Sequence, residues 1–203
     1  MRIGADHGRS DAGHGGAVAV GSALAVGPAS RVPFAVLAHG LRGDQQQVAA
    51  WQARTTELTD TPGPTQLRRA RPLPVFAAVR IATHSGDLHD AATLVEQAKA
   101  LPPSRYVAYA RSAAAELAVV AELPGAQYLL DLARSEGDHP WAAACSARAA
   151  GRLHDDADRL TESVERWERL GARVERACTL LLLHGRADEG RAELAALGAP
   201  RPG

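Results

Sequence analysis

Apolar residues recur at helical spacing between Pro74 and Gly198, and short breaks separate the apolar runs. The pattern predicts first helices that begin near residues 74, 104, 139 and 173, with partner helices that begin near 88, 125, 157 and 187. Successive first helices are about 30–35 residues apart, which is the period of stacked helix-turn-helix units. The breaks combine glycine or proline with residues that can cap a helix, and they are Ser85-Gly86-Asp87, Pro102-Pro103-Ser104, Leu123-Pro124-Gly125, Glu136-Gly137-Asp138, Leu170-Gly171 and His184-Gly185.

This periodicity predicts an all-α fold, a short α-solenoid of stacked antiparallel helical hairpins. A short internal repeat favours this fold. One helical-repeat period separates Ala144-Cys145-Ser146 from Ala177-Cys178-Thr179, and a Gly-Arg pair follows each of them. The alternative is a bundle of four unrelated antiparallel helices. Trp141 and Trp167 are expected to anchor the core between the helices.

The N-terminal part of the chain has a different pattern. Residues 1–43 are rich in glycine, alanine and valine without helical periodicity, and we expect a flexible or only locally structured segment that need not belong to a folded module. Residues 44–72 are predicted to hold one short helix followed by a linker that is rich in proline. Residues 73–203 form the predicted helical-repeat domain.

Charge and composition exclude several functions. The 23 basic and 23 acidic residues cancel, so we expect no direct DNA binding by this chain. The only lysine is Lys99, and a phosphate-binding GxxxxGK[ST] loop is therefore absent. No apolar stretch reaches the ~18 residues of a membrane span. The two cysteines form no C-x-x-C pair, and we expect a cytoplasmic protein.

The segment from Pro72 to Pro103 resembles a tetratricopeptide repeat. With Gly86 at the turn, Ala91 and Ala98 take the positions where that motif has small residues, and Pro103 takes the position of its closing proline. The sequence departs from the motif in the first helix, where Val75, Ala78 and Val79 replace a large aromatic residue and a Leu-Gly pair.

A second resemblance covers residues 73–200. Their sequence pattern is similar to that of the helical region that precedes the DNA-binding domain in large ATP-dependent regulators of the LuxR class. The runs that carry the resemblance are Ala149-Ala150-Gly151-Arg152-Leu153-His154-Asp155-Asp156, Leu160-Thr161-Glu162-Ser163-Val164, Trp167-Glu168-Arg169-Leu170-Gly171-Ala172, Glu175-Arg176-Ala177, Leu180-Leu181-Leu182-Leu183 and Arg191-Ala192-Glu193-Leu194-Ala195-Ala196-Leu197-Gly198.

This resemblance implies only the sensor or scaffold segment of such a regulator. The chain has no lysine for an ATP-binding loop, and it stops at Gly203, where the helix-turn-helix domain would begin. We therefore expect neither ATP hydrolysis nor direct DNA binding. The alternative function is that of a regulatory fragment of a split transcription factor, which acts through a separate DNA-binding subunit.

Candidate catalytic and metal-binding residues are few. His84, His89 and Asp90 lie around one turn, but no further ligand is placed to complete a zinc site, so we expect turn and capping roles for them. An enzyme that uses these three residues is the remaining catalytic alternative. Cys145 and Cys178 lie in apolar helices and are expected to be buried and unreactive. We expect no enzyme activity, no cofactor and no metal.

The leading functional hypothesis is a non-catalytic scaffold for protein-protein interaction. Stacked hairpins form a concave groove lined by the first helix of each pair, and such a groove suits a protein or peptide partner. The groove residues that we expect to contact a partner are Arg80, Tyr106, Tyr109, Arg148 and Arg176. The terminal hairpins lack obvious polar caps and offer a surface for a homodimer.

Overall fold

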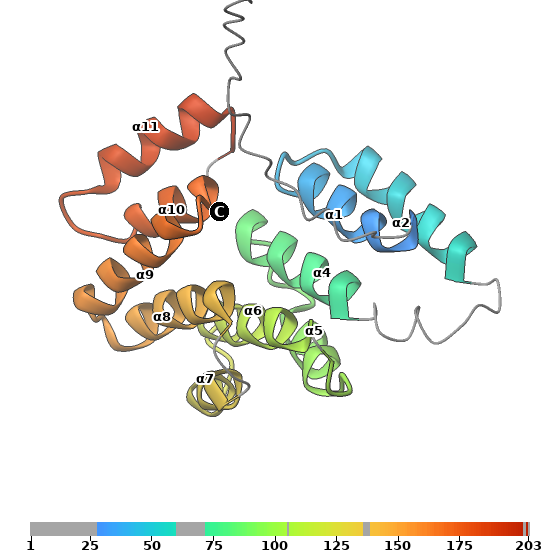
Figure 1. Ribbon diagram of the computed structural model, residues 1–203, viewed down its shortest axis with the longest axis horizontal. Coiled ribbons are helices and arrows are strands. Elements are labelled where there is room, and N and C mark those ends of the chain that lie inside the picture. Colours follow the sequence, from blue (N-terminus) through green and yellow to red (C-terminus); the bar gives the residue numbers. More distant parts are fainter. Residues whose placement is uncertain (1–27, 60–71, 105, 136–138, 201, 203) are drawn as a thin grey trace, which may run out of the picture.

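The protein is helical throughout the part of the chain that the structure describes. The computed structural model describes residues 28–59, 72–104, 106–135, 139–200 and 202. Within these ranges there is no strand (Figure 1). The helices, in chain order, are α1 (Pro28–Gly40), α2 (Gln45–Thr59), α4 (Pro72–Ser85), α5 (Ala91–Lys99), α6 (Val107–Val120), α7 (Ala126–Ser135), α8 (Pro140–His154), α9 (Ala157–Arg169), α10 (Arg173–Leu180) and α11 (Ala187–Leu197).

The helix starts expected from the apolar pattern are confirmed to within a few residues, from α4 through α11. Local signals account for this agreement. Pro140 stands in the first turn of α8, where its missing N–H costs no hydrogen bond. The Asp156 carboxylate accepts hydrogen bonds from the backbone N–H groups of Asp158 and Arg159, both at 3.0 Å, and so caps α9. Gly171 follows α9 with a φ of 66°, a conformation that glycine adopts without strain.

Consecutive helices pack in pairs, α1 with α2, α4 with α5, α6 with α7, α8 with α9, and α10 with α11. The first helices of successive pairs also pack against one another, α1 on α4, α4 on α6, and α6 on α8. In Figure 1 the pairs follow an arc from α1 and α2, through α4, α6 and α8, to α10 and α11. The arc brings residues far apart in the sequence to its inner side.

Small residues allow the paired helices to approach closely. Ala91 and Ala98 are 2% and 0% exposed, as expected for residues at a helix seam. A Cβ atom on Gly151 of α8 would lie 2.7 Å from Cγ of Leu160 on α9. A Cβ atom on Gly190 of α11 would lie 2.6 Å from the carbonyl oxygen of Ala177 on α10. Close packing at these seams therefore depends on the absence of a larger side chain.

The structure differs from the sequence prediction between residues 28 and 43. Helix α1 lies in the segment that was expected to be flexible or only locally structured, and it packs against both α2 and α4. Val36 of α1 is buried with Val48 and Ala77. Gly40 lets α1 approach Ile81, because a Cβ atom there would overlap that side chain. Tertiary burial thus stabilises this short helix.

Two parts of the predicted organisation lie outside the described residues. They are the glycine-rich stretch 1–27 and the proline-rich linker 60–71. The short helix expected after residue 44 is confirmed as α2. None of the helices in the described ranges has the combined length and apolarity of a membrane span.

Candidate functional site

Four charged side chains meet in the interior of the arc, and each comes from a different first helix. Arg80 belongs to α4, Glu116 to α6, Arg148 to α8 and Glu175 to α10. We call these four residues the charge cluster. Arg80 and Glu116 are each 1% exposed and Arg148 is 2% exposed. Buried charges of this kind are tolerated only when they are paired and hydrogen-bonded.

Each arginine of the cluster contacts both glutamates. Arg80 donates through Nη1 to Oε2 of Glu116 at 2.6 Å, and through Nη2 to both carboxylate oxygens of Glu175 at 2.8 and 2.7 Å. Arg148 donates through Nε and Nη2 to the two oxygens of Glu116 at 2.5 and 2.9 Å. Its Nη2 also donates to Oε2 of Glu175 at 2.8 Å. The planar guanidinium groups therefore link helices that are distant in the sequence.

The cluster is electrically balanced, with two positive and two negative charges. Burial raises the pKa of Glu116, but the attraction of Arg148 and Arg80 outweighs burial and lowers this pKa to about 2. Burial also raises the pKa of Glu175, and the same two arginines again outweigh it and hold the pKa well below its usual range. Both carboxyl groups are therefore ionised at neutral pH and are saturated with arginine donors.

Aromatic side chains enclose one side of the cluster. The guanidinium carbon of Arg80 lies 5.6 Å from the ring centroid of Trp141, and that of Arg148 lies 5.3 Å from the ring centroid of Trp167. The two indole rings are 5.4 Å apart, and Trp167 is 0% exposed. The expectation that both tryptophans anchor the core is confirmed. These rings exclude water from the arginines and add cation-π contacts.

His84 and the two cysteines border the cluster. Arg80 Nη2 donates to Nε2 of His84 at 2.5 Å, and burial together with the charge of Arg80 lowers the pKa of His84. The imidazole is therefore neutral and accepts at Nε2. Cys145 Sγ lies 3.3 Å from Oε2 of Glu116, and Cys178 Sγ lies 3.8 Å from Nδ1 of His84. Both cysteines are buried, as expected, and burial raises the pKa of both thiols, that of Cys178 to about 11, which disfavours the thiolate.

A cleft of about 280 Å³ lies beside the cluster. It is formed by the turn between α1 and α2, the end of α4, the start of α10 and the residues around the end of α11. The residues that line it are Ala38, Gly40, Leu41, Arg42, Gly43, Gln45, His84, Ser85, Val174, Leu197, Gly198, Ala199, Pro200 and Pro202. His84 and Pro202 also line a void of about 10 Å³ that reaches Arg80, Glu116 and Arg148. The cleft and the charge cluster are thus neighbours.

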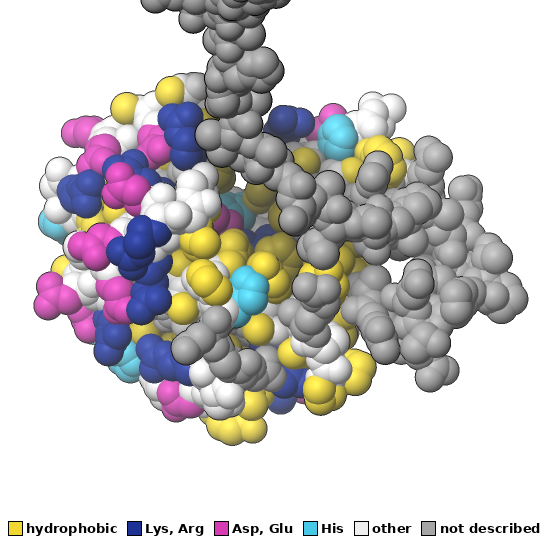
Figure 2. Space-filling model, in the orientation of Figure 1, with side chains coloured by type: hydrophobic (Ala, Val, Ile, Leu, Met, Phe, Trp, Pro, Cys, Tyr) yellow, Lys and Arg dark blue, Asp and Glu magenta, His cyan; other side chains and the backbone are white. Residues whose placement is uncertain are grey.

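The surface around the arc is uneven in chemistry. Figure 2 shows a hollow near the centre of this face, where hydrophobic side chains are exposed. The side formed by α8 to α11 instead carries basic and acidic side chains in close alternation. On that side Arg166 pairs with Glu162 at 2.6 Å, and Arg191 pairs with Asp188 at 2.5 Å.

The structure places the five predicted groove residues in three locations. Arg80 and Arg148 come together in the charge cluster. Both are buried there, so a partner could contact them only if the cluster opened. Tyr109 stacks near Phe76 and Trp141 with centroid distances of 5.7 and 5.5 Å, and Tyr106 lies 6.5 Å from Tyr109. Arg176 points away from the cluster and pairs with Glu189 and Glu193 of α11.

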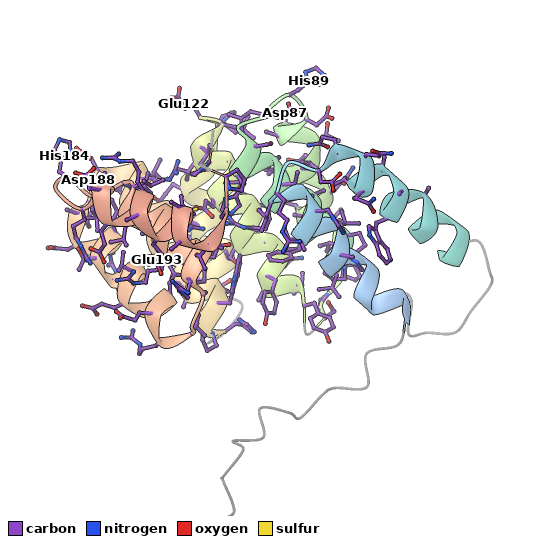
Figure 3. The ribbon with its side chains drawn as sticks, turned by 90° about the horizontal axis from the view of Figure 1, so that it is seen from above. Asp87, His89, Glu122, His184, Asp188 and Glu193 are labelled. Carbon is purple, nitrogen blue, oxygen red and sulfur yellow. The ribbon has the colours of Figure 1, made fainter. Side chains whose placement is uncertain are left out.

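The structure separates the three residues of the catalytic alternative. His84 turns toward Glu175, and its Nε2 lies 3.6 Å from Oε1 of that residue. The side chains of His89 and Asp90 are 89% and 75% exposed. Figure 3 shows His89 at the edge of the molecule, directed away from the interior, beside Asp87. Within the described ranges no three histidine, cysteine or acidic side chains are arranged to hold a metal ion.

Sequence reasoning missed Glu116 and Glu175. A signal for Glu116 is present, because it is the only charged residue between Arg111 and Glu122 in an alanine-rich helix. Arg80 is likewise the only charged residue of its apolar helix. Isolated charges in the first helices of successive pairs could have indicated a shared interior site. A comparison of the chain with family models, with curated proteins and with solved structures finds no match.

Proposed function

We propose that the protein is a non-catalytic scaffold of stacked helical hairpins, with a tetratricopeptide-like solenoid arrangement, that binds a protein or peptide partner. The serial packing of α1, α4, α6 and α8, each with its own second helix, supports the hairpin arrangement. The observation that carries the binding function is the cleft of about 280 Å³ between the first and the last helical pairs.

The lining of the cleft suits a peptide. Leu41, Val174 and Leu197 supply apolar surface, while Arg42 and Gln45 supply polar groups at its rim. Such a mixture of apolar contact and a few polar groups is typical of binding sites in proteins. The cleft walls come from helices that are separated in the chain, so the fold must hold those helices in a fixed relation.

The charge cluster supplies this fixed relation. It links α4, α6, α8 and α10 through bonds between residues that are 36, 32 and 27 positions apart. Buried polar groups with few alternative partners favour one arrangement of the helices over others. The ionised, fully bonded state of Glu116 and Glu175 leaves neither carboxylate suited to proton transfer, which supports a structural role over a catalytic one.

A peptide selection tests this proposal. Random peptides are enriched on the full chain, and their affinities are then measured for Gln45→Trp and for Gln46→Trp. Both glutamines are exposed at the start of α2, but only Gln45 lines the cleft. We expect Gln45→Trp to weaken binding at least about tenfold, because an indole fills the cleft and removes well-packed contact.

The matched variant Gln46→Trp should bind the enriched peptides as the wild type does. Equal binding by all three proteins, or a selection that enriches no peptide, would contradict the proposed function. A dimer of the chain through the cleft would appear instead as a change in sedimentation that Gln45→Trp abolishes.

A further inference from the structure

Glu175 differs from the other three members of the charge cluster in how it is held. Arg80, Glu116 and Arg148 belong to α4, α6 and α8, and α6 packs directly against both of the other two helices. Glu175 belongs to α10, which packs extensively against α9 and α11 instead. The Glu175 side chain is 14% exposed, whereas that of Glu116 is 2% exposed. The last helical pair therefore inserts one carboxylate into a site that the other helices build.

The site around this carboxylate has the geometry of a receptor for an acidic group. Arg80 Nη2 reaches both oxygens, at 2.8 and 2.7 Å, and Arg148 Nη2 reaches Oε2 at 2.8 Å. Without Glu175, the two arginines and Glu116 carry a net charge of +1 in an enclosed position. Such a position attracts a carboxylate strongly, because planar guanidinium groups match its two oxygens.

The position of α10 connects this receptor to the cleft. Val174, the neighbour of Glu175, lines the cleft, and so does His84, which borders the carboxylate. Withdrawal of the Glu175 side chain from the two arginines would open the receptor toward the cleft, while Arg148 Nη1 keeps α10 in place through its bond to the carbonyl oxygen of Glu175 at 3.1 Å.

We propose that Arg80 and Arg148 bind an acidic side chain of a protein partner, and that Glu175 occupies this position in the free protein as an internal competitor. This inference rests on the proposed function of the cleft as a peptide-binding site, and it specifies the partner as a segment with glutamate or aspartate beside apolar residues. The apolar residues contact Leu41, Val174 and Leu197, while the carboxylate replaces that of Glu175. Binding of the partner and withdrawal of the Glu175 side chain are then coupled.

The experiment compares the full-length wild type with Glu175→Gln, which keeps the size of the side chain but removes its charge. The probe is a fluorescein-labelled peptide of alternating glutamate and leucine, and fluorescence anisotropy measures its affinity. An internal competitor lowers the apparent affinity, because only molecules in which Glu175 has left the two arginines can bind the probe. We therefore expect Glu175→Gln to bind about tenfold more tightly than the wild type. The same peptide with glutamine in place of glutamate should show no gain.

The control variant is Glu193→Gln. Glu193 is also a poorly exposed partner of an arginine, but it pairs with Arg176 outside the cluster. This variant should bind the probe as the wild type does. Adding Arg148→Gln to Glu175→Gln should abolish the gain, because it removes a donor to the incoming carboxylate.

Several results would overturn the inference. One is an equal gain in affinity for the probe in Glu175→Gln and Glu193→Gln. Another is no gain in affinity in either Glu175→Gln or Glu175→Ala, when circular dichroism shows that both variants keep the helical content of the wild type. Loss of the helical spectrum in both Glu175 variants would also overturn it, since the carboxylate would then be a requirement of the fold. Failure of this test leaves the effect of Gln45→Trp on selected peptides unchanged, so the two proposals fail separately.

Discussion

Among the glutamates that accept hydrogen bonds from two arginines, Glu116 lies in the interior and Glu162 lies on the surface. Glu116 accepts from Arg80 and Arg148 and is 1% exposed. Glu162 accepts from Arg159 and Arg166 on the outer face of α9, and its side chain is 33% exposed. The chemistry of the two triads is the same, and only their surroundings differ.

The comparison shows how burial changes the role of an ion pair. The pairs of Glu162 are local, three and four residues apart in one helix, and water screens them. The pairs of Glu116 join three helices and are almost fully buried, so water screens them far less. The interior triad therefore controls tertiary structure, whereas the surface triad adds a little helix stability.

The largest expected effect comes from Glu116→Gln. Removing the carboxylate leaves Arg80 and Arg148 buried with only Glu175 to balance them, and breaking a buried ion pair in this way costs about 3–5 kcal/mol. The free energy of unfolding, measured by urea denaturation at pH 7, should fall by this amount. A loss below 1 kcal/mol would show that the interior arginines find other partners, which would contradict the geometry described above.

Protonation of Glu116 at low pH should break the interior triad. The pKa of Glu116 is lowered from 4.5 to about 2 in the folded protein, so its contribution to stability is complete above pH 4.5 and is lost as the pH falls toward 2. The shift corresponds to about 3 kcal/mol of stability that disappears across this range. Unfolding free energies at pH 5 and pH 2.5 measure it, and Glu116→Gln should show a correspondingly smaller loss.

The smallest expected effect comes from Glu162→Gln. Local pairs of this kind contribute about 0.2–0.5 kcal/mol each, so the free energy of unfolding should change by less than about 1 kcal/mol. In 1 M salt, where the Debye length is about 3 Å, this difference should vanish, while the effect of Glu116→Gln persists. Urea denaturation with and without added salt tests both statements. Equal losses for the two variants would remove the distinction between the triads.

The same distinction explains which parts of the structure the sequence could predict. The starts of the helices from α4 to α11 follow from neighbouring residues, such as Pro140 and the capping Asp156, and they were predicted closely. The surface pairs of α9 were also visible as charges three and four residues apart. Helix α1 could not be predicted from the sequence, because its stability depends on the burial of Val36 against Val48 and Ala77.

The candidate site could be predicted only in part. Arg80 and Arg148 were expected to act together, but as open groove residues, and the structure encloses them. Glu116 and Glu175 were not expected at all. Their separations from their arginine partners vary, so no constant repeat spacing points to a shared position.

The sequence by itself determined the helical character of this protein, the positions of most of its turns and the small residues at its seams, because these depend on backbone preferences and on contacts within a few residues. Only the tertiary structure decided that four charges from four helices meet in one place, and that a cleft lies beside them. Hydrogen bonds and ion pairs act over a few ångströms, so these contacts exist only after the packed helices have brought distant parts of the chain together.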